Sequence, residues 1–280
     1  MKTITYIFFI ILTGFMVSCS DDDNNTEVDE LAGLLKVQEF TNDTHVMEAY
    51  TKSGKFIQGY NDITLRIKDK TTGKYIDNAQ ISWMPVMHMM SMNHSCPKSA
   101  VIKVAEAKTT FNGYIVFQMP ENDMEGWDLT MDYNIGGMNY TVKDDISVPA
   151  SGKQVVTSFM ASDGKRYIVA LIEPSDPKVA VNDMRVGVYT MENMMSFPVV
   201  KNFRLDLDPR MPGMGNHSSP NNQNLVFNSA ENVYDGKLSL TMTGYWKLNL
   251  ILRNEGGTVM KGEPVTETNE SSTLFLEIEF

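Results

Sequence analysis

The sequence predicts an all-β protein, with two tandem immunoglobulin-like β-sandwich domains that follow a lipoprotein signal peptide. Three observations predict this class. Apolar and polar residues alternate in nearly every ordered segment, the chain repeats with a period of about 120 residues, and a short apolar N-terminal run ends in a cysteine. Alternation with a period of two is typical of half-buried strands. Sustained helical spacing is lacking beyond residue 36, so we expect no helical domain.

Residues 1–18 are predicted to be a signal peptide, because Lys2 precedes an apolar run whose length fits a secretory segment better than a membrane span. The run ends at Met16-Val17-Ser18-Cys19, which resembles a lipobox, so Cys19 is the expected lipidation site. The acidic run Asp21-Asp22-Asp23 then resembles the export signal of Bacteroidota lipoproteins. We therefore expect an outer membrane lipoprotein, on the cell surface or the periplasmic face, that contacts the membrane through its N-terminal lipid.

The alternating segments are expected to be strands, and turns of the form Asn-x-Gly-Gly that begin at Asn134 and Asn254 are typical of tight hairpins. In chain order the segments are 63–67, 127–133, 203–207, 238–242, 246–250 and 274–280. After an acidic tether over 19–32, they place a first sandwich domain at 33–161 and a second at 162–280. Residues 155–160 are then the expected last strand of the first domain.

The two domains are expected to be copies of one unit. Asn216-His217-Ser218 follows Asn93-His94-Ser95 by 123 residues, and Trp246 follows Trp127 by 119. In this alignment Met84-Pro85-Val86-Met87 corresponds to Met211-Pro212-Gly213-Met214, and the first copy carries four more residues within 88–92. A repeat of this length fits one small domain per copy.

Charge and missing motifs exclude several classes of function. The formal net charge of −11 and the pI of about 4.8 argue against a nucleic acid partner, because such a partner needs a basic patch. The sequence has no G-x-S-x-G elbow, phosphate loop or zinc-hydrolase helix motif, so we expect no enzyme. If Cys19 carries lipid, Cys96 is the only remaining thiol, which excludes a disulfide within the mature chain.

Methionine and histidine are concentrated in the two motif copies. Thioether sulfur is a soft, neutral donor that selects Cu(I) over hard cations, and imidazole binds copper and zinc alike. Neither copy has the paired spacing of zinc sites, so the expected cofactor is copper, as Cu(I), or silver. The candidate ligands are Met84, Met87, His88, Met89, Met92, His94 and Cys96 in the first copy and Met211, Met214 and His217 in the second.

Spacing alone does not choose among these donors. Met84 and Met211 lie at expected strand ends, where methionine often fills gaps in a core. Cys96 has three open roles: a ligand, which is slightly favoured by His94 two residues away, an inert small hydrophobe, or half of an intermolecular disulfide. Because the first copy offers more donors than the second, we expect it to bind Cu(I) or Ag(I) more tightly.

The order of these motifs resembles the YtkA-like and FixH-like domains of exported bacterial proteins. It consists of a strand, a Met-Pro-x-Met loop with a nearby His, an aromatic-x-Gly turn and a Trp-led strand. The resemblance covers approximately residues 55–145 and 175–280. It implies copper handling and cytochrome oxidase assembly, so the chain is expected to buffer metal or pass it to an efflux or oxidase-assembly partner. The residues that carry this implication are Met84, Met87, His94, Met211, Met214 and His217.

An alternative interpretation needs no metal. Flexible, polarizable methionine suits surfaces that adapt to a partner, so the Met-rich loops of a cell-surface sandwich protein would make protein contacts. The metal content of the purified protein distinguishes this interpretation from the first.

Overall fold

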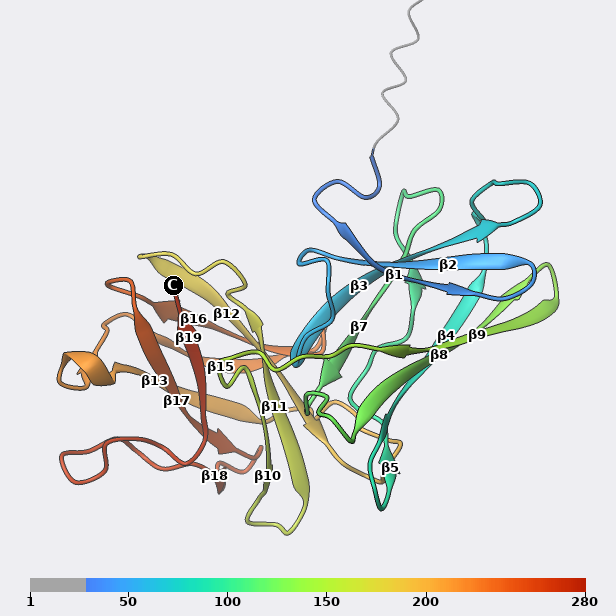
Figure 1. Ribbon diagram of the computed structural model, residues 1–280. Helices are drawn as coiled ribbons and strands as arrows, with labels where there is room; N and C mark the ends of the chain where they lie inside the picture. Colours follow the sequence, from blue (N-terminus) through green and yellow to red (C-terminus); the bar gives the residue numbers. More distant parts are fainter. Residues whose placement is uncertain (1–28) are drawn as a thin grey trace, which may run out of the picture.

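The computed structural model describes residues 29–280 and contains two β-sandwiches side by side (Figure 1). The predicted signal peptide, the lipidation of Cys19 and most of the tether lie outside the described residues. In the first sandwich, one sheet has the order β1-β2-β3-β7-β6 and the other β5-β4-β8-β9, and all neighbouring strands are antiparallel. The bounds are β1 Leu35–Thr41, β2 His45–Thr51, β3 Gly59–Asp69, β4 Gln80–His88, β5 Asn93–His94, β6 Ile102–Lys103, β7 Phe111–Phe117, β8 Gly126–Ile135 and β9 Met138–Ile146.

The second sandwich repeats this strand order, but its strands form one continuous sheet, because β13 pairs with β15 as well as with β17. Strands β10-β11-β12-β16-β15 follow the order of the first sheet, and β14-β13-β17 follows β5-β4-β8. The place of β9 is taken by β18 and β19, which both pair with β17. The bounds are β10 Val156–Met160, β11 Arg166–Glu173, β12 Val181–Thr190, β13 Arg204–Met211, the 3-10 turn η1 Pro212–Met214, β14 His217–Ser218, β15 Gln223–Asn228, β16 Val233–Ser239, β17 Tyr245–Arg253, β18 Val259–Lys261 and β19 Phe275–Glu279.

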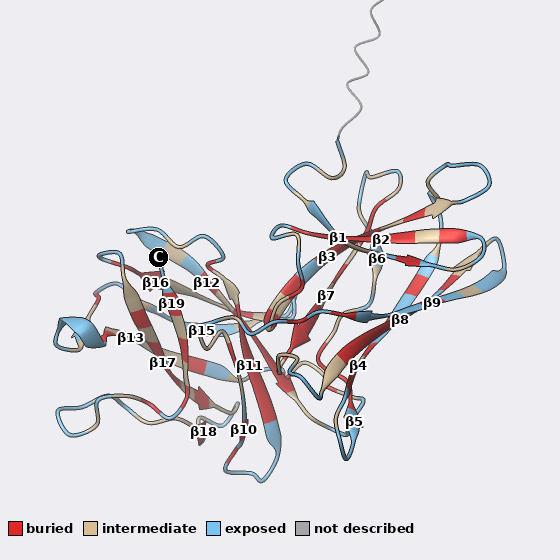
Figure 2. Ribbon diagram, in the orientation of Figure 1, coloured by how far each residue is buried: buried red, intermediate tan, exposed pale blue. Residues whose placement is uncertain are grey.

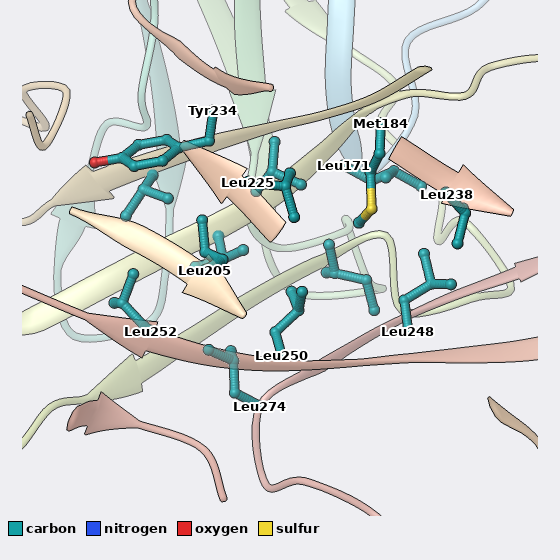
Figure 3. Close-up of a cluster of buried hydrophobic side chains, with 14 of the residues drawn as sticks. Leu171, Met184, Leu205, Leu225, Tyr234, Leu238, Leu248, Leu250, Leu252 and Leu274 are labelled. Atoms are coloured by element: carbon teal, nitrogen blue, oxygen red, sulfur yellow. The ribbon is translucent and has the colours of Figure 1, made fainter. Parts of the chain in front are cut away.

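The predicted tandem of two all-β sandwiches is confirmed, and the alternation has its expected cause. Inward side chains of the two facing layers of strands form one apolar core in each sandwich. Figure 3 shows the second core, where leucines from β13, β15 and β17 meet Met184 of β12 and Tyr234 of β16. Trp127 and Trp246 are buried at matching places, and their Nε1 atoms donate to the carbonyls of Met119 and Met242 at 3.0 and 3.1 Å.

The expected domain boundary is wrong by one strand. β10 pairs with β11 from Val156↔Ala170 to Met160↔Arg166, so residues 156–160 open the second sandwich instead of closing the first. In the second copy β10 occupies the place that β1 has in the first. Alternation alone could not distinguish the two assignments, because a strand with one apolar face suits the end of one domain as well as the start of the next.

The two sandwiches pack against each other through the outer faces of two sheets. Val116 of β7 is buried with Ile168 and Ala170 of β11, in a cluster that also contains Val156, Tyr189 and Phe197. Tyr114 lies 6.3 Å from Tyr189 between ring centroids. The buried stretches of β7 and β11, red in Figure 2, lie at this junction. Among residues 29–280, no helix is long and apolar enough to cross a membrane.

Candidate metal centre

The first motif copy forms a strand hairpin, β4–β5, at one end of the first sandwich. Met87 on β4 stands directly opposite His94 on β5, and on its other side it pairs with Trp127 on β8. All three side chains point into the sandwich: Met87 is fully buried, His94 is 6% exposed and Trp127 is 1% exposed. Facing residues of an antiparallel pair have Cβ atoms about 4.5–5.5 Å apart, so the side chains of Met87 and His94 start side by side on this face.

The tip of the hairpin adds two more thioethers to the same face. The backbone N–H of Met89 donates to the carbonyl of Met92 at 3.0 Å, which closes the turn one pair beyond His88 and Asn93. Because side chains alternate between faces along a strand, Met89 and Met92 share the face of Met87 and His94. Met89 packs against the first core, whereas Met92 is 46% exposed. We call Met87, Met89, Met92 and His94 the hairpin array.

The imidazole of His94 is oriented by its neighbours. Its Nδ1 atom lies 2.8 Å from the carbonyl oxygen of Ser95 and 3.2 Å from the side-chain amide nitrogen of Gln118, which also donates to that carbonyl at 3.1 Å. When Nδ1 donates to the Ser95 carbonyl, the lone pair of the neutral ring is on Nε2, which has no hydrogen-bond partner among the described residues. A histidine that ligates a metal commonly donates its other N–H to a backbone carbonyl in this way. The ring stands edge-on to Trp127, with centroids 5.7 Å apart.

Two predicted ligands of the first copy lie on the opposite face of the same sheet. Met84 and His88 alternate with Met87 along β4, so their side chains point outward. His88 contacts the carboxylate of Asp128. The same carboxylate forms an ion pair with Lys143, whose Nζ lies 2.9 Å from Oδ2. The sequence suggested a Met-Pro-x-Met loop here, with all the donors available to one ion. Because β4 extends to His88, the pleat instead separates Met84 and His88 from the hairpin array.

Cys96 is part of the first core. It is 1% exposed, and burial raises the pKa of its thiol well above the usual range. A metal ligand must be the thiolate, which this environment disfavours. Of the three roles left open by the sequence, the small buried hydrophobe fits this position.

The second copy carries the same cross-strand pair, but in another alignment than the sequence suggested. Met211 pairs with His217 on one side. On the other side Arg210 pairs with Lys247, so the next residue along β13, Met211, stands opposite Trp246. Met211 is therefore the counterpart of Met87, not of Met84. Counted from the paired methionine to the paired histidine, the first copy is longer by one residue, not by four.

The error has a specific source in the sequence. The shared element is Pro85-Val86-Met87 and Pro209-Arg210-Met211, whose prolines pair with Leu129 and Leu248 respectively. A second proline follows Met211 and mimics the Met-Pro step of the first copy. In the structure that proline begins η1, and Met214 at the end of this turn is 57% exposed.

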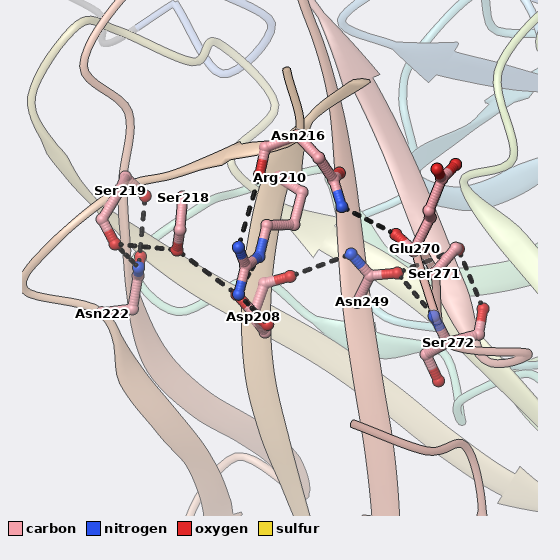
Figure 4. Close-up of polar contacts among 10 residues, drawn as sticks. All are labelled: Asp208, Arg210, Asn216, Ser218, Ser219, Asn222, Asn249, Glu270, Ser271 and Ser272. Carbon is pink, nitrogen blue, oxygen red and sulfur yellow. Dashed lines mark hydrogen bonds and ion pairs between the residues drawn. The ribbon is translucent and has the colours of Figure 1, made fainter. Parts of the chain in front are cut away.

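Polar contacts hold the turn of the second hairpin (Figure 4). Asp208 accepts two hydrogen bonds from the guanidinium of Arg210, at 2.8 and 2.9 Å. Arg210 also donates to the carbonyl of Asn216, whose side-chain amide donates to the carbonyl of Glu270. This copy thus offers two thioethers and one imidazole: Met211 is buried, and Met214 and His217 are exposed.

Sequence reasoning gave no role to a methionine pair in the second domain that lies next to the first motif. The backbone N–H of Ser95 donates to the carbonyl of Met194 at 2.8 Å. Met194 and Met195 belong to the loop between β12 and β13, about 100 residues away in sequence. A signal was present, since Met-Met-Ser occurs both at 89–91 and at 194–196.

Within residues 29–280, no three His, Cys, Asp or Glu side chains gather in an arrangement that could hold a metal ion. The hairpin array is a different kind of set, in which three of the four donors are thioethers. Such a donor set suits a soft, monovalent ion.

No family model and no curated protein match this chain. One similar solved structure is FdeC, an adhesin of Escherichia coli, with 11% identity and a TM-score of 0.24. The match covers 73% of this chain and 57% of that one, so the chain spans little more than half of its length. Another is a conserved domain protein from Bacillus anthracis, with 10% identity and a TM-score of 0.33 over 90% of this chain and 93% of that one.

Proposed function

We propose that this chain is a lipid-anchored protein of the cell envelope that binds Cu(I) or Ag(I) through the hairpin array. The observation that carries the proposal is the geometry of two facing pairs, Met87 with His94 and Met89 with Met92, on one face of one hairpin. Three neutral sulfurs and one imidazole nitrogen form a donor set that prefers a soft monovalent ion to Zn(II), Ca(II) or Mg(II).

The surroundings of the array suit such an ion. Buried Met87 and His94 form its floor, and half-exposed Met92 leaves a route from solvent. Trp127 packs edge-on against the imidazole and is itself buried, so the inner side of the site is shielded from solvent. Thioethers gain little from water, whereas hard competing cations lose their hydration shell at such a site.

In this proposal the protein buffers the metal or transfers it to an efflux or oxidase-assembly partner at the outer membrane. A half-exposed donor at a hairpin tip supports transfer, because a partner can reach Met92 without unfolding the sandwich. The pair Met211 and His217 forms a second, weaker site with Met214. Its smaller donor set supports a rank order in which the first sandwich loads before the second.

The test is competition for Cu(I) between the apo full-length protein and a coloured chelator under reducing conditions. Met89→Leu with Met92→Leu removes two sulfurs from positions that are not fully buried, so the fold tolerates the change. We expect the affinity of the tighter site to fall at least about tenfold. Met138→Leu is the matched control, because Met138 is 62% exposed at the β8–β9 turn, beyond the far end of β8 from Trp127. If the wild-type protein fails to compete for Cu(I) even with a weak chelator, the proposal is refuted.

A second candidate function uses the same hairpin without metal. Met90 at its tip is 76% exposed, and an exposed large apolar side chain supports contact with another protein. The titration separates the two candidates, since only the metal site requires sulfur. If the wild-type protein binds no Cu(I) or Ag(I), protein contact through Met90 and Met92 takes the place of the first proposal.

A further inference from the structure

We infer that the loop 191–196 of the second sandwich supplies a thioether to the metal held by the hairpin array, so that the ion is bound between the two domains. The inference rests on the proposed function and assigns Met194 and Met195 as its additional ligands. The contact that carries it is the hydrogen bond of 2.8 Å from the backbone N–H of Ser95, the residue after His94, to the carbonyl of Met194.

Both partners of this contact are held firmly. On the first sandwich, Ser95 is fully buried, and the carbonyl of Pro97 accepts from the backbone N–H of Val116 at 2.8 Å. On the second, the backbone N–H of Met195 donates to the side chain of Asn193 at 2.8 Å, and Phe197 is buried in the cluster that joins the sandwiches. The loop therefore lies against the segment after His94 as a fixed part of the structure.

The methionine side chains of the loop are not accounted for by packing. Met194 and Met195 are 42% and 43% exposed, so neither fills a gap in a core. Their backbone is fixed beside Ser95, the residue after His94, by the hydrogen bond to the carbonyl of Met194. A donor that is neutral, flexible and exposed beside a set of three thioethers and one imidazole is suited to complete the coordination of Cu(I) or Ag(I).

Comparison of the two copies provides an internal control. The loop after β3 is the counterpart of the loop after β12, because β3 and β12 occupy the same place in their sheets. It contains no methionine, and the side chain of Asp69 closes it through hydrogen bonds to Thr71 and Thr72. Of these two loops, only the one that contacts the motif of the other domain carries the Met-Met pair.

The test uses the full-length protein with Met194→Leu and Met195→Leu together, substitutions that keep side-chain volume and remove sulfur. We expect the affinity for Cu(I) at the tighter site to fall at least about tenfold. X-ray absorption at the copper edge should show fewer sulfur scatterers than in wild type. Met138→Leu again serves as the control, with unchanged affinity and sulfur number.

The outcomes distinguish this inference from the proposed function. If Met89→Leu with Met92→Leu weakens binding but the loop variant retains wild-type affinity and sulfur number, the interdomain ligand is refuted and the array alone holds the ion. If the wild-type protein binds neither Cu(I) nor Ag(I), both are refuted. A loss of affinity and sulfur in the loop variant, with an unchanged circular dichroism spectrum, establishes the interdomain site.

Discussion

Met87→Leu separates the structural role of Met87 from its proposed role as a metal ligand. The side chain is fully buried in the first core, so its truncation to Ala should cost about 2–5 kcal/mol of stability. Leucine has nearly the same volume, and this exchange should cost less than about 1.5 kcal/mol. Both variants remove the sulfur, but only the leucine variant keeps the core filled.

The magnitude for metal binding follows from linkage. An ion present at about 100 times its dissociation constant stabilises the folded protein by about 2.7 kcal/mol. If Met87→Leu weakens binding about tenfold, the same concentration is only about ten times the new constant, and the stabilisation falls to about 1.4 kcal/mol. Ag(I), which needs no reductant, is the appropriate probe.

The assay is urea unfolding followed by tryptophan fluorescence, with and without Ag(I), for the wild type and Met87→Leu. Trp127 stands opposite Met87, so one fluorophore reports directly on this end of the sandwich. The result that refutes the reasoning is an Ag(I)-induced stabilisation of Met87→Leu equal to that of wild type. In that case the sulfur of Met87 is not a ligand, and its burial is packing alone.

Two further predictions concern the interface and the thiol. Ala170→Asp places a charge among the apolar residues that join the sandwiches, so we expect a loss of more than about 3 kcal/mol in urea unfolding; a loss below about 0.5 kcal/mol would show that the two outer faces are not packed in solution. Because burial raises the pKa of Cys96, its thiol stays protonated at neutral pH. Mass spectrometry should therefore show slow alkylation of the folded protein and fast alkylation in urea, and equal rates would contradict the buried position.

The strands and their duplication could be predicted from sequence, because each copy presents one apolar face to its core. The predicted segment 127–133 lies within β8, and the segment 246–250 lies within β17. Trp127 and Trp246 then mark the same place in each sandwich. This information is local, since the pleat itself fixes which residues share a face.

The composition of the candidate site was only partly predictable. Once β4 is known to run through His88, alternation alone separates Met84 and His88 from Met87. The sequence suggested a loop there, because proline is depleted in strands. The repeated Met-Met-Ser marks Met194 in the sequence, but its position beside Ser95 could not be predicted, because that position depends on how the two domains pack.

The buried faces between the sandwiches make each copy dependent on the other. A chain cut between the copies would expose Val116 on one fragment and Ile168 on the other, with the aromatic rings around them. Each fragment would then present an adhesive apolar sheet face to solvent and would tend to aggregate or to pair with another copy. The shared buried cluster therefore makes the solubility of each half depend on the presence of the other.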